Sequence, residues 1–87
     1  MDTVKIPNVF TPNGDGINDF LYIRGIDYGE WQLTVYNRWG REVYQNNHYD
    51  NGQNRWDANG CSEGVYYYIL INTGTKETHT GYVEVIR

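Results

Sequence analysis

The chain has 87 residues, a formal net charge of −4 and one cysteine. Its length predicts a single domain with one modest core, and the lone cysteine excludes an internal disulfide. The acidic balance and the scattered basic residues argue against a nucleic acid partner, because phosphate binding needs clustered Lys and Arg. No apolar run is long enough for membrane insertion and no signal peptide is recognisable, so we expect a cytosolic protein or a piece of a longer exported one.

Strand-forming and turn-forming residues dominate the composition, with nine Tyr, three Trp and ten Gly. Good helix formers are scarce, so the sequence predicts an all-β fold. Six or seven short antiparallel strands separated by turns predict an immunoglobulin-like β-sandwich, although the Cys…Trp…Cys pattern of true immunoglobulin domains is absent.

Residues 4–10 form the first predicted strand, and Pro7 within it lacks the N–H that a ladder bond needs. We therefore expect this strand at a sheet edge or with a bulge. A second strand is predicted at residues 20–24, where Leu21 and Ile23 alternate with polar or aromatic neighbours.

The loop between these strands combines Gly14 and Gly16 with four side-chain oxygen donors. Calcium takes about six to eight oxygen ligands, and the spacing is similar to the start of an EF-hand loop without its final Glu. A tight hairpin loop is the alternative, since Asn-Gly and Asp-Gly are strong turn signals. The segment predicted to hold calcium comprises Asn13, Asp15, Ile17 (in the third ligand position), Asn18 and Asp19.

Residues 31–37 give the clearest strand, because Trp31, Leu33 and Val35 alternate with more polar residues. This period of two predicts one buried face, with Trp31 in the core. A tight turn follows, and residues 41–45 return as the hairpin partner.

The turn itself, Asn37-Arg38-Trp39-Gly40, is the second distinctive motif. Gly40 permits the turn, and Arg38 can pair with a carboxylate or lie over an aromatic ring. Two interpretations stay open at this point. The motif is either a hairpin turn clamped by an arginine, or a partner-binding site made of Asn37, Arg38, Trp39 and Gly40.

The residue pattern in the second half of the chain predicts two more strands. Trp56 follows a polar loop and is expected to plug one end of the sandwich. Residues 65–71 are apolar or aromatic throughout, which predicts a central strand covered on both faces. Residues 78–86 form the last strand, to which a partner can add a strand if it lies at a sheet edge. The predicted contact residues there are Val85, Ile86 and Arg87.

Catalytic residue types are few and lie in separate segments: Cys61, Ser62, His48 and His79. Nucleophilic catalysis needs Ser or Cys held against His, and a zinc site needs three or four His or Cys ligands. We therefore expect neither an enzyme nor a zinc protein.

Exposed aromatic side chains would also suit a carbohydrate-binding module or a calcium-stabilised adhesion module of a cell-surface protein. Trp31, Trp39 and Trp56 with the tyrosines could stack on sugar rings, but Trp31 and Trp56 are better explained as residues that complete the core.

Several motifs together resemble one known family. Residues 6–20 closely resemble the opening of the gliding-motility-associated C-terminal domain of Bacteroidetes, also described as the type B sorting domain of the type IX secretion system. Similar motifs follow in the family's order: Asn37 to Gly40 with Val43 and Tyr44, Trp56 and Asp57 (with Ala58 where the family has Gly), Gly64 to Tyr68, and Gly81 to Arg87.

The resemblance implies that residues 1–87 are one C-terminal sorting domain, a fragment of a larger secreted protein whose cargo is attached on its N-terminal side. Components of the type IX translocon would recognise the folded domain in the periplasm. They would then carry it across the outer membrane, so that the protein is secreted or displayed on the cell surface.

Overall fold

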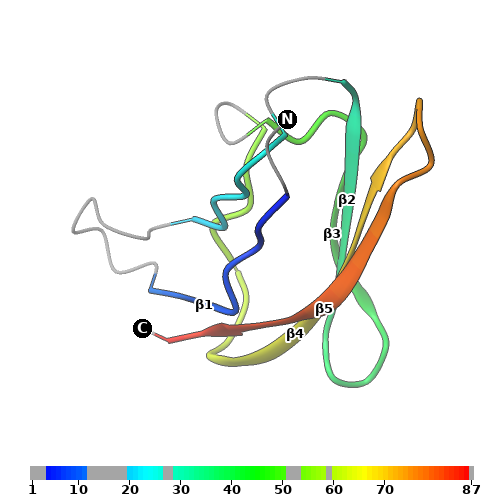
Figure 1. Cartoon of the computed structure of the whole chain (residues 1–87). Coiled ribbons are helices and arrows are strands. Elements are labelled where there is room, and N and C mark those ends of the chain that lie inside the picture. Colours follow the sequence, from blue (N-terminus) through cyan, green and yellow to red (C-terminus); the bar gives the residue numbers. More distant parts are fainter. Residues whose placement is uncertain (1–3, 12–19, 27–28, 51–53, 59, 87) are drawn as a thin grey trace.

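Five strands form one sheet in the computed structural model, which describes residues 4–11, 20–26, 29–50, 54–58 and 60–86. The sheet order is β1-β5-β4-β2-β3 (Figure 1). The prediction of an all-β domain is confirmed. The strands are β1 (Val9–Phe10), β2 (Trp31–Tyr36), β3 (Glu42–Asn46), β4 (Gly64–Asn72) and β5 (Thr78–Val85).

One strand pair departs from the antiparallel arrangement that we expected. β1 runs parallel to β5, with Val9 opposite Glu84 and Phe10 opposite Val85. The other three pairs are antiparallel. β1 is the edge strand of the sheet, so the edge position predicted from Pro7 is confirmed.

A second layer of irregular segments, residues 20–26 and 54–58, lies on one side of the sheet (Figure 1). The predicted strand at residues 20–24 forms only an isolated bridge there, in which the Lys5 and Arg24 N–H groups bond each other's carbonyl oxygens at 3.0 and 2.9 Å. The first predicted strand is correspondingly short. The strand count is therefore five within the described residues, and the domain is sandwich-like with one regular layer.

The core lies between the sheet and this second layer. Trp31 and Trp56 are buried as predicted, with 4% and 3% of their surface exposed. The Trp56 ring stands edge-on to the rings of Phe10 and Tyr66, with centroids 5.4 and 5.6 Å apart. Fully buried aliphatic residues from both layers complete the core: Leu21, Ile23, Leu33, Val35, Leu70, Val83 and Val85.

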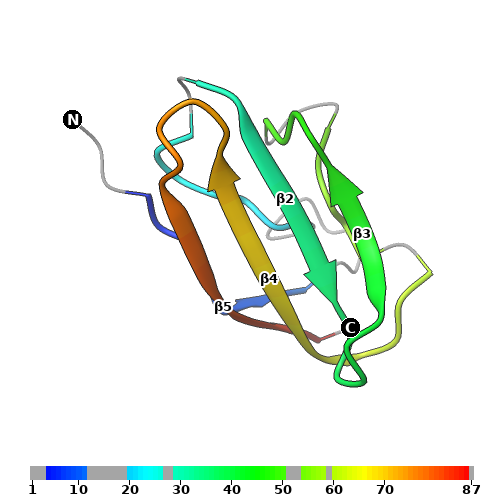
Figure 2. The same ribbon diagram turned by 90° about the vertical axis from the view of Figure 1, so that its right-hand side faces the viewer.

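None of the described segments forms a second layer on the opposite face of the sheet, and Figure 2 looks onto that face. Tyr67 and Val65 of β4 are 50% and 39% exposed on this outer face. The expectation that β4 is covered on both faces is therefore wrong. Apolar residues on both faces of a strand predict double coverage only when enough chain remains to form a further layer, and the irregular segments 20–26 and 54–58 lie on the inner face. The structure contains no helix within its described residues that is long and apolar enough to span a membrane.

Candidate partner-binding site

The turn between β2 and β3 is held by four hydrogen bonds that all involve Asn37. The Asn37 N–H bonds the Arg41 carbonyl oxygen at 2.8 Å, and the Gly40 N–H bonds the Asn37 carbonyl oxygen at 2.9 Å. The Asn37 side-chain oxygen accepts from the Trp39 and Arg41 N–H groups at 3.0 and 2.9 Å. Gly40 has φ 81°, a left-handed conformation that glycine adopts without strain. These contacts fix the backbone of the hairpin tip, defined here as Asn37, Arg38, Trp39 and Gly40.

The Trp39 side chain projects from the hairpin tip and is 76% exposed, more than any other large apolar side chain in the described residues. The Arg38 guanidinium carbon lies 4.3 Å from the centre of the Trp39 ring, which is cation–π geometry. The arginine therefore packs on the exposed indole. This arrangement presents a flat apolar ring and a positive charge side by side.

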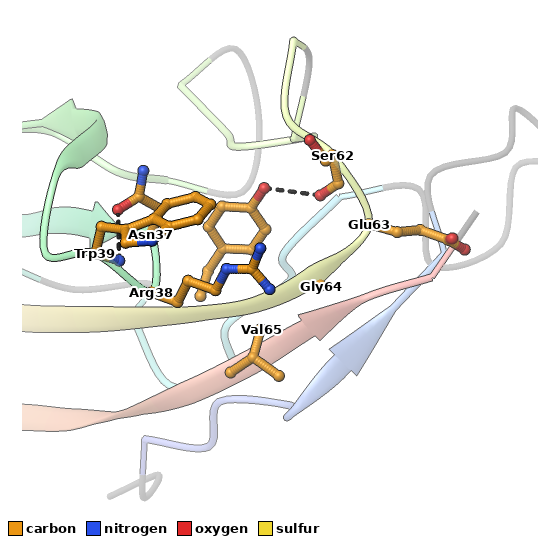
Figure 3. Close-up of a pocket in the computed structure, with 8 residues that line it drawn as sticks. Asn37, Arg38, Trp39, Ser62, Glu63, Gly64 and Val65 are labelled. Carbon is orange, nitrogen blue, oxygen red and sulfur yellow. Dashed lines mark hydrogen bonds between the residues drawn. The ribbon is translucent and has the colours of Figure 1, made fainter.

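A small pocket of about 90 Å³ separates the hairpin tip from the start of β4 (Figure 3). Asn37, Arg38 and Trp39 line one wall, and residues 62–66 line the other. The Tyr66 hydroxyl donates to the Ser62 carbonyl oxygen at 2.7 Å, which holds the second wall in place. The two walls meet because β2 ends beside the start of β4, where Tyr36 lies opposite Tyr67.

The pocket is far smaller than the roughly 300–1,000 Å³ of a typical small-molecule site. It has room for one side chain of a partner protein. Trp and Arg are the residues most often found at energetic hot spots of protein interfaces. The hairpin tip and its pocket therefore fit a protein surface that offers an apolar or acidic side chain.

The other predicted site residues are placed only in part. Asn13, Asp15, Ile17, Asn18, Asp19 and Arg87 lie outside the described residues. Val85 is 1% exposed and its side chain belongs to the core. Ile86 is 40% exposed, and its N–H bonds the Phe10 carbonyl oxygen at 3.1 Å. No group of three or more His, Cys, Asp or Glu that could hold a metal occurs in the part of the chain that the structure describes.

A family model, the CHU_C type IX secretion signal domain, matches residues 4–85. The chain belongs to this family. As a CHU_C domain it is a sorting domain of the type IX secretion system, so the family and function expected from the sequence motifs are confirmed. The protein that carries the domain is therefore exported and either secreted or displayed at the cell surface. No curated protein and no solved structure matches the chain.

The sequence did not predict that residues 62–66 form one wall of the pocket in this CHU_C domain. Of the wall residues 62–66, only Gly64, Val65 and Tyr66 belong to a predicted strand motif, and nothing in the sequence spacing connects them to Trp39. The two segments become neighbours through the pairing of β2 with β4, which joins residues more than 25 positions apart. A single sequence carries no direct signal for such a long-range pairing.

Proposed function

We propose that the folded domain is a sorting signal and that a component of the type IX translocon recognises it by binding to the hairpin tip. This surface is supported by the exposed Trp39 ring, which projects from a backbone turn held by the Asn37 bonds and has Arg38 packed against one of its faces. A preorganised aromatic anchor loses little conformational entropy on binding, which favours recognition. The domain itself performs no reaction in this proposal.

The proposal extends to the path of the attached protein. A cargo covalently joined on the N-terminal side reaches the periplasm, and the translocon then carries cargo and domain across the outer membrane. The resemblance to the gliding-motility-associated domains supports an origin in Bacteroidetes. We also propose a contact at the C-terminal segment, where Ile86 is 40% exposed beside the buried Val85 and Arg87 follows in the sequence.

Calcium is a further part of the proposal. Asn13, Asp15, Asn18 and Asp19 supply oxygen donors in a segment whose sequence also contains Gly14 and Gly16. Two carboxylates within one short loop repel each other unless a cation or a proton lies between them. A calcium ion would therefore order this loop.

Export of a reporter fused to the domain tests the proposed function in a bacterium that has a type IX system. We expect the reporter to reach the medium or the cell surface only when the domain is attached. Trp39→Ala should lower export because it removes the apolar anchor, while Tyr22→Ala, at a 52% exposed aromatic in the other layer, should not.

The two levels of the proposal fail in different ways. Export of the reporter without the domain would show that the domain does not act as a sorting signal. Full export of a folded Trp39→Ala fusion would be compatible with a sorting function, but it would exclude the hairpin tip as the recognition site.

A further inference from the structure

The outer edge of β5 is covered along only part of its length. β1 pairs with Glu84 and Val85 at the end of the strand. The segment before β1 leaves the sheet, because Lys5 bonds Arg24 in the second layer. Among the described residues, no strand pairs with the outer edge of β5 from Thr78 to Tyr82. We call this stretch the open edge.

The direction of the backbone groups along the open edge follows from the bonds to β1. The Glu84 N–H bonds the Asn8 carbonyl oxygen at 2.8 Å, and the Ile86 N–H bonds the Phe10 carbonyl oxygen at 3.1 Å. Backbone groups of alternate residues in a strand point to the same side. The register of β5 with β4 is continuous, so no bulge changes this alternation. The N–H and C=O groups of Thr78, Thr80 and Tyr82 therefore point to the open edge.

The open edge lacks the features that normally prevent a further strand from adding. Native edge strands are protected by charged side chains, prolines or bulges. Residues 78–82 contain no Lys, Arg, Asp, Glu or Pro. By contrast, β3 at the other end of the sheet carries the exposed Glu42 and a register shift opposite Val35 and Tyr36.

The side chains beside the open edge also suit an added strand. Thr78, Thr80 and Tyr82 are exposed, and β-branched and aromatic residues stabilise cross-strand pairs. Tyr82 lies opposite Tyr67, so a strand added here would find two half-exposed rings on the outer face.

We infer that the open edge receives an extended segment of the translocon protein that recognises the domain, which adds to the sheet in line with β1. This inference rests on the proposed function and names a second contact for the same partner. β1 supports it, because an extended segment already occupies the same edge at Glu84 and Val85. The segment would be uncharged opposite Thr80 and apolar opposite Tyr82. Pairing of two copies along five edge residues would bury less than the roughly 800 Å² per partner of a stable interface.

Thr80→Pro is the most specific test, because it removes an N–H that points to the open edge and leaves the bonds to β4 intact. Proline is tolerated in an edge strand when its missing N–H faces away from the sheet. We expect a folded Thr80→Pro fusion to lose export, and a Thr80→Val fusion, which keeps the N–H and the branched side chain, to be exported normally. Circular dichroism and thermal unfolding of the fusion verify that it is folded.

A second pair of variants keeps the test valid if Thr80→Pro fails to fold. Thr34, Ile69 and Thr80 lie in one row across the outer face, with Thr34 two strands away from β5. Thr80→Lys places a charge at the open edge and should abolish export, while Thr34→Lys places the same charge on the same face and should not.

The outcomes separate this inference from the proposed function. If the wild-type fusion is not exported, the proposed function fails. If it is exported and folded Thr80→Pro or Thr80→Lys is exported equally well, the inference is overturned. Loss of export in Thr34→Lys would mean that the translocon binds the outer face of the sheet and not the open edge. Sedimentation should show a monomer, and a dimer that Thr80→Pro dissociates would replace the partner strand by a second copy of this chain.

Discussion

The Tyr49 hydroxyl donates a hydrogen bond to the Leu21 carbonyl oxygen across 2.5 Å. The Tyr49 hydroxyl oxygen in turn accepts from the Trp56 N–H at 3.0 Å, and the Tyr49 N–H bonds the Trp31 carbonyl oxygen at 2.9 Å. Tyr49 is only 2% exposed. One buried residue therefore connects residues 20–26 and 54–58 of the second layer to the sheet.

Tyr49→Phe should destabilise the domain by about 1–3 kcal/mol, because it leaves the Leu21 carbonyl and the Trp56 N–H buried without this partner. Urea unfolding followed by tryptophan fluorescence measures the change. Tyr22→Phe is the matched control, since that ring is 52% exposed, and it should change stability by less than about 0.5 kcal/mol. Equal stability of Tyr49→Phe and the wild type would mean that water replaces the hydroxyl.

Stability should also fall at alkaline pH. Burial raises the pKa of the Tyr49 hydroxyl above the value of about 10 that is usual for tyrosine. In the unfolded chain this hydroxyl ionises near that usual value, so the stability that its burial contributes is complete below that pH and is lost as the pH rises above it. The expected slope is up to about 1.4 kcal/mol per pH unit for this one group.

Urea unfolding at several pH values above 10 tests this dependence, with Tyr49→Phe as the comparison. The slope should be smaller in the variant but not zero, because burial also raises the pKa of Tyr44 and Tyr68. Identical slopes in both proteins would assign the alkaline transition to other groups.

Local patterns predicted β2, the hairpin after it and the core position of Trp31. Each of these depends on alternation or turn chemistry within about ten residues, which a single sequence displays. The parallel pairing of β1 with β5 joins positions about 75 apart, from Val9 to Glu84, and the hydrophobic pattern is equally compatible with an antiparallel edge. The irregular second layer was not predicted for a different reason, because part of it has the residue pattern of a strand. Leu21 and Ile23 alternate as in a strand, yet among the described residues this segment pairs only through the isolated bridge between Lys5 and Arg24.

Ala58, which stands where the family motif has glycine, adopts a backbone conformation that glycine reaches more easily. It has φ 60°, in the left-handed region, where the family's glycine would lie without strain. Its carbonyl oxygen accepts from the Cys61 N–H at 2.9 Å, and its side chain is fully buried. The cost of this conformation for a non-glycine residue is about 1–2 kcal/mol, and burial of the methyl group offsets roughly 0.8 kcal/mol of it.

Gly81→Ala should destabilise the domain because the Tyr68 ring lies across Gly81 from the opposite strand. A Cβ atom at position 81 would lie 2.6 Å from the Tyr68 hydroxyl oxygen and 3.0 Å from Cζ. Displacing this ring, which is 9% exposed, should cost about 1–3 kcal/mol. The double variant with Tyr68→Phe removes the closest atom, so the two effects should be less than additive in urea unfolding. Strict additivity would mean that the ring moves freely.

Calcium should bind the chelated protein in calorimetric titration and raise its Tm. The affinity can be as weak as about 10⁻⁴–10⁻³ M, as in other extracellular modules. At a hundredfold excess over the Kd, the added stability is about 2.7 kcal/mol. Asp15→Asn should weaken binding, while Glu30→Gln, an exposed acid outside the loop, should not. No heat and no Tm shift at about 10 mM calcium would exclude the site.

Asn37→Ala should loosen the hairpin tip without unfolding the domain. It removes the acceptor of the Trp39 and Arg41 N–H groups, which are solvent-accessible, so the loss of stability should be about 0.5–1.5 kcal/mol. Amide hydrogen exchange at Arg41 should become faster, and reporter export should fall because Trp39 is no longer held in one orientation. Asn37→Asp keeps an acceptor in the same place and should retain slow exchange and export. If Asn37→Ala exchanges faster but is exported as well as Asn37→Asp, then rigidity of the tip does not contribute to recognition.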